Sequence, residues 1–209
     1  MQENGLVFSA LCADFNMDFD KEDNEAEIKR TMEMMDLAVD LGTNVITTHI
    51  HNIPDDVNAP GYKTIQRSIK LLGDYGDSIG VYFASETGPE KAFKLKRLLD
   101  SVDTKSARVN LDPANFVMLC GQDPVDAVYV LRDYIVHTHA KDGVKADNKD
   151  GYLEMPLGQG KVPFADYLAA LKDIGYDGFL TIEREVGENA EADIRHAYDF
   201  LTEQLKRLY

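Results

Sequence analysis

The 209-residue chain has no tryptophan, only two cysteines and no long apolar run. Cys12 and Cys120 lie among apolar residues without CxxC spacing, so we expect two buried free thiols in a reducing cytosol. No apolar stretch approaches the ~18 residues of a membrane span, and the stretch 1–16 lacks the basic segment of a signal peptide. These absences predict a cytoplasmic protein without a membrane partner.

Basic residues are also scarce, since 22 Lys and Arg stand against 37 Asp and Glu and give a net charge of -15. A chain this acidic repels nucleic acid and anionic membrane surfaces, so we expect no nucleic-acid partner. A local basic group still leaves room for a small anionic substrate. The length suits one domain with a sizeable core, and no linker or repeat divides residues 1–209.

Short apolar runs alternate along the chain with amphipathic stretches. The first such stretch places Ile28, Met32, Met35 and Val39 at helical spacing, and Gly42 then predicts the end of a helix. Similar spacing recurs further along the chain. The apolar runs are rich in Val, Ile, Phe and Thr, which is typical of strands buried on both faces. These expected strands are residues 6–11, 45–48, 81–85, 107–111, 134–138 and 179–182.

Reactive side chains follow five of these six runs. In a (β/α)8 barrel all parallel strands end at one face, which holds the active site, whereas an open sheet concentrates its chemistry at a switch point. The glycine-rich dinucleotide fingerprint is absent. The pattern therefore favours a TIM barrel. Six strands instead of eight predict a partial barrel lacking the first two βα units: a truncated product, an open barrel, or a barrel completed by another chain in an oligomer.

The last reactive residue of four strands gives a candidate metal site. Glu86, Asp112, His139 and Glu183 would repel one another at one end of a barrel, and a bound divalent cation removes that cost. One imidazole and three carboxylates form a hard, open set of ligands. We expect one divalent metal, Mn²⁺ first, with Mg²⁺, Co²⁺ and Zn²⁺ as alternatives.

The stretch YIVHTHAKDG at 134–143 carries four ionisable groups at the end of one strand. Strand alternation points His137 and His139 the same way, with His139 nearer the strand end and His137 one layer deeper, as a core histidine or a support for a ligand. Lys141 either aims its ammonium at a substrate oxygen or extends to solvent. Asp142 either caps the next loop or holds Lys141.

Glu86 and Glu183 come from strands far apart in the sequence and are expected to flank a substrate. Such a pair takes a proton from a carbon next to a carbonyl on one face and returns one on the other. A metal would polarise the carbonyl and stabilise the enediolate.

The motifs resemble those of the xylose isomerase-like TIM-barrel superfamily of sugar isomerases and epimerases, inosose dehydratases and isomerases, and apurinic endonucleases. HTHAKDG followed by PLGQGKV is quite specific, whereas SETG or LDPAN alone is weak. The motifs stand in the family's order as NVITTHIHNIP, SETG, LDPANF, IVHTHAKDG and PLGQGKVPF, and the resemblance covers essentially the whole chain.

The resemblance implies roles for individual residues. The family's metal ligands fall on Glu86, Asp112, His139 and Glu183, and in epimerases of this group the two glutamates are the acid–base pair. His49 matches a histidine at the barrel mouth that faces substrate, and we count it with Lys141 among the catalytic residues. The residues that we assign to substrate binding are Asn115, which replaces a histidine of some ketose epimerases, His51, which replaces a glycine, Asp142 and Glu185.

Three functions remain open at this point. The first is a metal-dependent isomerase or epimerase that acts on a sugar, keto-sugar or cyclitol through an enediolate. The second is a lyase on the same scaffold, either an inosose dehydratase or an enzyme of β-elimination from a 3-keto-glycoside. The third is a non-catalytic barrel fragment that binds a sugar or a partner subunit. An apurinic endonuclease needs more histidines than five and a basic DNA groove, so the charge argues against it.

Overall fold

The computed structural model describes residues 2–208, which form two compact units. Unit 1 contains residues 1–86 and 94–110, and unit 2 contains residues 87–93 and 111–209. The expectation of one partial barrel domain over residues 1–209 stays a prediction.

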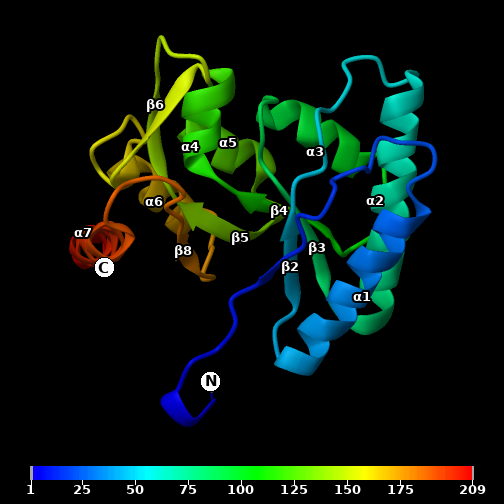
Figure 1. Ribbon diagram of the computed structural model, residues 1–209, viewed down its shortest axis with the longest axis horizontal. Coiled ribbons are helices and arrows are strands. Elements are labelled where there is room, and N and C mark those ends of the chain that lie inside the picture. The colour runs from blue at the N-terminus through cyan, green and yellow to red at the C-terminus, as the bar shows by residue number, and fades with distance from the viewer. Residues whose placement is uncertain (1, 209) are drawn as a thin grey trace. The chain divides into compact units, whose positions relative to one another are not determined.

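Unit 1 is a parallel sheet with helices alongside (Figure 1). Its strands lie in the order β1, β2, β3, β4, and each pairs in parallel with the next. Helix α1 packs against α2 and β2, and α2 packs against β3. The elements are a short 3-10 turn at Gln2–Asn4, β1 Leu11–Cys12, α1 Glu25–Leu41, β2 Val45–Thr48, α2 Pro60–Ile79, β3 Tyr82–Glu86, α3 Ala92–Asp100 and β4 Ala107–Leu111.

The helices of unit 1 follow from local sequence. Ile28 and Met35 of α1 are buried, as the helical spacing predicts, and the helix ends at Gly42 in the left-handed conformation with φ of 77°. Pro60 opens α2 because its fixed φ suits the first helical turn. Val39, the fourth residue of the predicted apolar stripe, is half exposed at 50%.

Unit 2 contains a second parallel pair, in which β5 runs beside β8, and an antiparallel hairpin of β6 and β7. The sequence pattern did not predict this hairpin. Helix α6 packs against α5 and α7, and α7 packs against β8. The elements are α4 Pro113–Asn115, a π-helical turn Phe116–Cys120, α5 Pro124–Leu131, β5 Ile135–Ala140, β6 Asp142–Lys145, β7 Tyr152–Met155, α6 Phe164–Asp173, β8 Leu180–Ile182 and α7 Ala190–Leu208.

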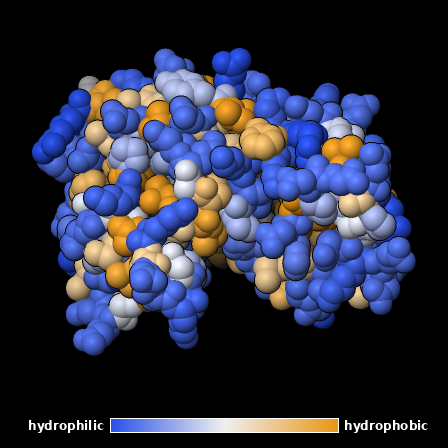
Figure 2. All heavy atoms as spheres, turned by 90° about the horizontal axis from the view of Figure 1, so that it is seen from above, coloured by the Kyte–Doolittle hydropathy of each residue, from blue (hydrophilic) through white to orange (hydrophobic). Residues whose placement is uncertain are grey.

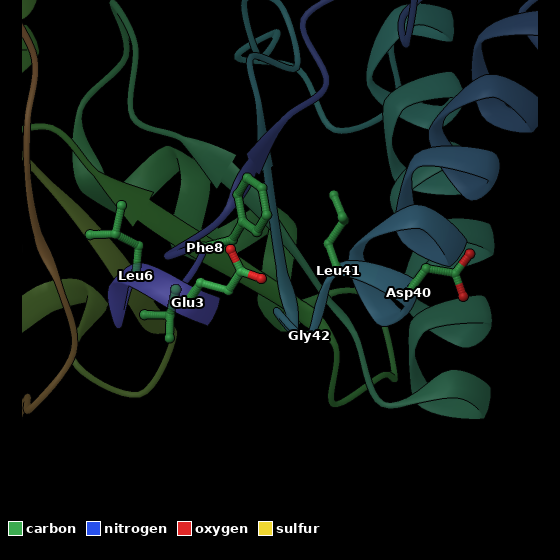
Figure 3. A pocket seen from close by; sticks show the side chains of 7 residues that line it. Glu3, Leu6, Phe8, Asp40, Leu41 and Gly42 are labelled. Carbon is green, nitrogen blue, oxygen red and sulfur yellow. The ribbon is translucent and has the colours of Figure 1, made fainter. Parts of the chain in front are cut away.

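Five of the six expected strands are present within two residues of their expected ends. The expectation for residues 6–11 is wrong, because the strand there is only Leu11–Cys12. Leu6 and Val7 are 56% and 70% exposed and line a surface pocket together with Leu41 at the end of α1 (Figure 3). Apolar composition alone therefore misplaced this strand.

The thiol expectation is confirmed in one respect and wrong in another. Neither Cys12 nor Cys120 forms a disulfide, but Cys12 is exposed and Cys120 is only half-buried. Hydrophilic side chains cover most of the face seen in Figure 2, in keeping with the 28% of charged residues. Among the described residues, every helix is too short or too polar to cross a membrane.

Candidate metal centre

Asp112 follows β4 and its two carboxylate oxygens have different environments. Oδ1 accepts hydrogen bonds from the backbone N–H groups of Ala114 at 2.7 Å and Asn115 at 3.3 Å, so Asp112 caps the short helix α4. Oδ2 is buried and accepts no hydrogen bond from any residue that the structure describes. A buried carboxylate oxygen that accepts no hydrogen bond is costly, and the ammonium of Lys141, 4.0 Å away, compensates it by charge alone. Oδ2 therefore remains available as a metal ligand.

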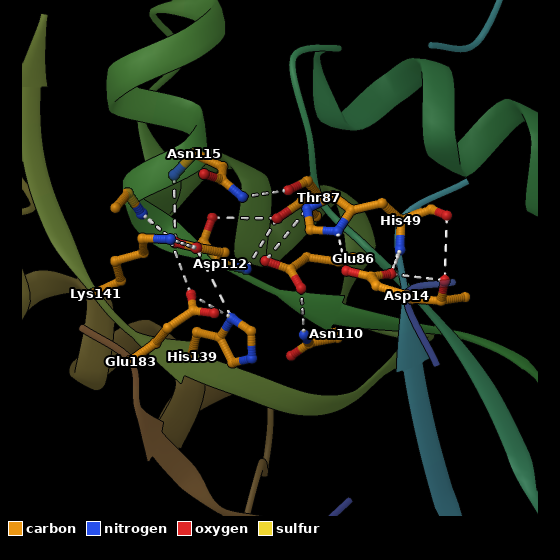
Figure 4. Close-up of polar contacts among 12 residues, drawn as sticks. Asp14, His49, Glu86, Thr87, Asn110, Asp112, Asn115, His139, Lys141 and Glu183 are labelled. Atoms are coloured by element: carbon orange, nitrogen blue, oxygen red, sulfur yellow. Dashed lines mark hydrogen bonds and ion pairs between the residues drawn. The ribbon is translucent and has the colours of Figure 1, made fainter. Parts of the chain in front are cut away.

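His139 and Glu183 lie next to each other in unit 2, close to Asp112 (Figure 4). His139 Nδ1 is 3.1 Å from Glu183 Oε2 and 3.8 Å from Asp112 Oδ2. The parallel register produces this approach, because Ala140 pairs with Ile182 and its carbonyl accepts the N–H of Glu183 at 3.2 Å. Three residues thus direct one nitrogen and two oxygens toward a common point, a set that suits a hard divalent cation.

Lys141 is buried beside these carboxylates, so the alternative in which it extends to solvent is wrong. Its Nζ is 3.0 Å from Glu183 Oε2 and 4.0 Å from Asp112 Oδ2, and it donates a hydrogen bond to Glu185. The Oε2 atom of Glu154 lies 3.9 Å from the same Nζ atom. The expected contact of Lys141 with a substrate stays a prediction.

These charges set the protonation of the site. Burial raises the pKa of Glu183, but the hydrogen bond and charge of His139 and the ammonium of Lys141 outweigh it and lower the pKa from 4.5 to about 2. Burial lowers the pKa of Lys141, but Asp112, Glu185 and Glu183 raise it well above its ordinary value. Glu183 is therefore ionised and Lys141 protonated at neutral pH.

Glu86 ends β3 in unit 1 and is buried there. Its Oε2 accepts a hydrogen bond from Asn110 Nδ2 at 3.2 Å, and its Oε1 lies 3.7 Å from His49 Nε2. Asn110 is part of β4, whose pairing with β3 places it directly opposite Glu86. The sheet of unit 1 thus fixes this carboxylate beside an imidazole.

Asp14 orients His49 and is a residue that the sequence reasoning missed. Its Oδ2 lies 2.8 Å from His49 Nδ1, while its Oδ1 accepts the N–H of His49 at 2.7 Å and the hydroxyl of Thr48 at 2.8 Å (Figure 4). Burial raises the pKa of Asp14, but the hydrogen bonds from His49 and Thr48 lower it overall. The signal was available, because Asp14 closely follows the first strand.

Two other residues assigned to substrate binding have structural roles. Both oxygens of Asp142 accept backbone N–H groups at 2.8 to 3.0 Å, one from the adjacent Gly143 and three from the loop between β7 and α6. Of the two alternatives the structure therefore shows a loop cap, but the loop is the one after β7 and not the next one along the chain. Gly160 is required there, because a Cβ atom would lie 2.1 Å from Asp142 Oδ1. Asn115 is buried and donates a hydrogen bond to the Thr87 carbonyl at 2.8 Å. Their contacts with substrate stay predictions.

His51 has a positive φ of 73°, a conformation that favours glycine. The family that the sequence resembles has glycine at this position, and this backbone conformation explains why glycine suits it. The side chain is half exposed, with Nδ1 3.7 Å from Asp20 Oδ2. Its role toward substrate stays a prediction, as does that of Glu185.

His137 lies one layer below His139, as the alternation predicts. Its side chain is 2% exposed, and Nε2 lies 2.8 Å from the hydroxyl of Thr181. Burial, with a smaller contribution from His139, lowers the pKa of His137 from 6.5 to about 4. His137 is a buried neutral histidine that supports the layer above it.

This burial predicts that stability depends on pH. Between the lowered pKa of folded His137 and 6.5, the unfolded chain binds more protons at this residue than the folded chain does. The contribution of neutral His137 to the free energy of unfolding is therefore fully present above pH 6.5 and is lost as the pH falls toward 4. We expect urea unfolding of the chelator-treated protein to show about 2 kcal/mol less stability at about pH 5 than at about pH 7. His137→Gln should remove most of this difference, and an unchanged difference in that variant would contradict the assignment.

Within unit 2, the side chains of Asp112, His139 and Glu183 have donor atoms that lie within 4.8 Å of one another and could hold a metal ion. These are three of the four residues that the strand ends predict, and the part of Glu86, which belongs to unit 1, stays a prediction. The uncapped oxygen of Asp112 and the imidazole nitrogen of His139 fit a divalent cation by their chemistry.

A family model described as xylose isomerase-like TIM barrel matches residues 1–204. The chain belongs to this family. The predicted fold class is thereby confirmed, and it is supported by a solved structure of a xylose isomerase domain protein from Planctomyces limnophilus. That structure is 26% identical, with a TM-score of 0.89 over 99% of this chain and 79% of that one. A D-tagatose 3-epimerase-like protein, 20% identical with a TM-score of 0.75 over 95% of this chain and 77% of that one, shows the same fold.

Two curated relatives are also similar. An uncharacterized protein of Methanocaldococcus jannaschii is 26% identical over 182 residues, which are 78% of this chain and 59% of the relative. An inosose dehydratase of Lacticaseibacillus casei is 25% identical over 142 residues, which are 59% of this chain and 47% of the relative. The chain thus spans between about half and three fifths of the length of these two relatives.

Proposed function

We propose that this protein is a divalent-metal-dependent isomerase or epimerase that acts on a sugar, keto-sugar or cyclitol. The observation that carries the proposal is the buried Oδ2 of Asp112, which accepts no hydrogen bond from the described residues and lies 3.8 Å from His139 Nδ1. Family membership supports it, because the family's members include sugar-transforming enzymes. The substrate itself is part of the proposal.

In the proposed site Asp112, His139 and Glu183 hold the cation, and Glu86 is the fourth ligand. The oxygen-rich set favours Mn²⁺ first and Mg²⁺ next. When bound, the cation supplies a positive charge that polarises the carbonyl of the substrate. The ligand roles are supported by the donor set and by the ionised state that the neighbours of Glu183 impose on it.

The proton transfers are assigned to Glu86 and Glu183. One carboxylate removes the proton from the carbon next to the carbonyl, and the other returns a proton to the opposite face. Asp14 keeps the imidazole of His49 directed at Glu86, so His49 is placed to exchange a proton with it or with a substrate hydroxyl. The buried ammonium of Lys141 is assigned to a substrate oxygen.

Exchange of the substrate's carbon-bound hydrogen with solvent tests this function. We expect that the Mn²⁺-loaded protein, incubated in D₂O with a panel of keto-sugars and cyclitols, incorporates one deuterium per epimerised or isomerised molecule without loss of water. Addition of a chelator should stop the exchange. Metal-loaded protein that exchanges no hydrogen of any panel member would contradict the proposal.

A lyase is the second candidate, and the similarity to an inosose dehydratase favours it. Both reactions begin with proton abstraction next to a carbonyl, and they differ in whether a leaving group departs. Mass spectrometry of the same D₂O reactions separates them, because dehydration or β-elimination lowers the mass of the substrate whereas epimerisation does not.

A further inference from the structure

Glu154 is a buried carboxylate on an otherwise exposed strand. It belongs to β7, whose neighbouring residues Tyr152 and Leu153 are 36% and 48% exposed, while the side chain of Glu154 is only 4% exposed. A carboxylate is rarely buried unless strong partners compensate the lost hydration. Its partners therefore explain why this strand turns a charged residue inward.

Both oxygens of Glu154 contact groups that hold the metal ligand Glu183. Oε1 accepts hydrogen bonds from Arg184 Nη1 at 2.8 Å and from the backbone N–H of Glu185 at 3.2 Å. These are the two residues that follow Glu183 in the chain. Oε2 lies 3.9 Å from Lys141 Nζ, and that ammonium is itself 3.0 Å from Glu183 Oε2. Glu154 thus restrains Glu183 in two ways, through the two residues that follow it in the chain and through Lys141.

Arg184 makes a second contact at the start of α7, with Asp193. We call Glu154, Arg184 and Asp193 together the clamp. Arg184 Nε donates to Asp193 Oδ2 at 2.7 Å, so the guanidinium is held between β7 and α7. Gly187 makes the approach of Arg184 to Asp193 feasible. Its φ is 117°, and a Cβ atom there would lie 2.7 Å from Asp193 Oδ2 and 3.0 Å from Arg184 Nη2.

We propose that Glu154 is a positioning residue that sets the affinity of the metal site by fixing the segment of Glu183 through Arg184, the Glu185 backbone and Lys141. This inference rests on the proposed function, because it concerns the cation that Glu183 would hold. It also gives the β6–β7 hairpin a defined role, since the hairpin presents one buried carboxylate to the loop after β8. Partners of this kind, hydrogen-bonded behind the ligands, commonly tune metal sites.

The affinity for Mn²⁺ tests the proposal directly. We expect Glu154→Ala to weaken Mn²⁺ binding by about 10- to 100-fold, measured by isothermal titration and by the electron paramagnetic resonance of free Mn²⁺. Glu154→Gln retains an acceptor for Arg184 and for the Glu185 N–H, so it should bind Mn²⁺ with most of the wild-type affinity. Glu191→Ala removes an exposed glutamate of α7, 88% exposed at its side chain, and serves as the matched control.

The outcomes separate this inference from the proposed function. Wild-type protein that binds no Mn²⁺ contradicts the proposed function. Wild-type protein that binds Mn²⁺ while folded Glu154→Ala binds it equally well overturns the positioning role alone. If far-UV circular dichroism shows that Glu154→Ala is unfolded, Arg184→Met tests the same clamp from its other side, and unchanged Mn²⁺ affinity in folded Arg184→Met overturns the proposal as well.

Discussion

Glu86→Gln is expected to slow solvent-deuterium exchange by about 10³-fold at saturating Mn²⁺. A glutamine amide can still accept the hydrogen bond of Asn110, so the side chain should remain in place beside His49. It cannot accept a proton from a carbon acid. The exchange rate, followed by NMR on whichever panel member reacts, measures the loss.

The control for this variant is Glu33→Gln, which makes the same chemical change on the exposed face of α1. Its exchange rate should equal that of the wild type. If folded, Mn²⁺-loaded Glu86→Gln exchanges within about threefold of the wild-type rate, Glu86 is not one of the two proton-transferring groups.

Lys141→Met is expected to destabilise the metal-free protein by about 3 kcal/mol, because it leaves a cluster of carboxylates without its buried cation. The carboxylates around the ammonium are those of Asp112, Glu154, Glu183 and Glu185. Methionine keeps most of the length of the side chain, so the loss reflects charge more than volume. Urea unfolding in the presence of a chelator measures the difference.

Mn²⁺ should reduce this difference, since a divalent cation replaces the missing positive charge. The stabilisation by excess Mn²⁺ is therefore expected to be larger in Lys141→Met than in the wild type. Lys149→Met, at an exposed position between β6 and β7, is the control and should leave the free energy of unfolding unchanged. A metal-free Lys141→Met protein as stable as the wild type would show that this ammonium does not compensate the cluster.

Much of the fold was predictable because buried parallel strands have a simple signature. The runs at 45–48 and 107–111 match β2 and β4 residue for residue. The run at 6–11 failed because apolar composition does not report whether a neighbouring strand is available to pair with. The β6–β7 hairpin escaped detection because its residues are mostly polar or exposed, and the one buried side chain of β7 is that of Glu154.

The residues of the candidate site also differ in whether the sequence could predict them. Asp112, His139 and Glu183 could be predicted, because residues at the ends of parallel strands meet at one edge of a sheet. Asp14 also follows a strand, but its contact with His49 could not be predicted, and Glu154 belongs to a hairpin that the sequence pattern did not predict. Asp14 reaches His49 across a strand pair, and Glu154 reaches Arg184 from a hairpin. Such tertiary contacts have no fixed spacing in the sequence.

The count of metal ions per chain tests the central claim most directly. Elemental mass spectrometry of protein supplied with Mn²⁺ and freed of excess ion should find about one divalent ion per chain, and fewer in Glu183→Gln, because that variant loses a charged ligand. The same count in Glu188→Gln, which changes an exposed glutamate of the loop after β8, should equal the wild type. Wild-type protein without bound metal after this treatment would contradict the metal-dependent function.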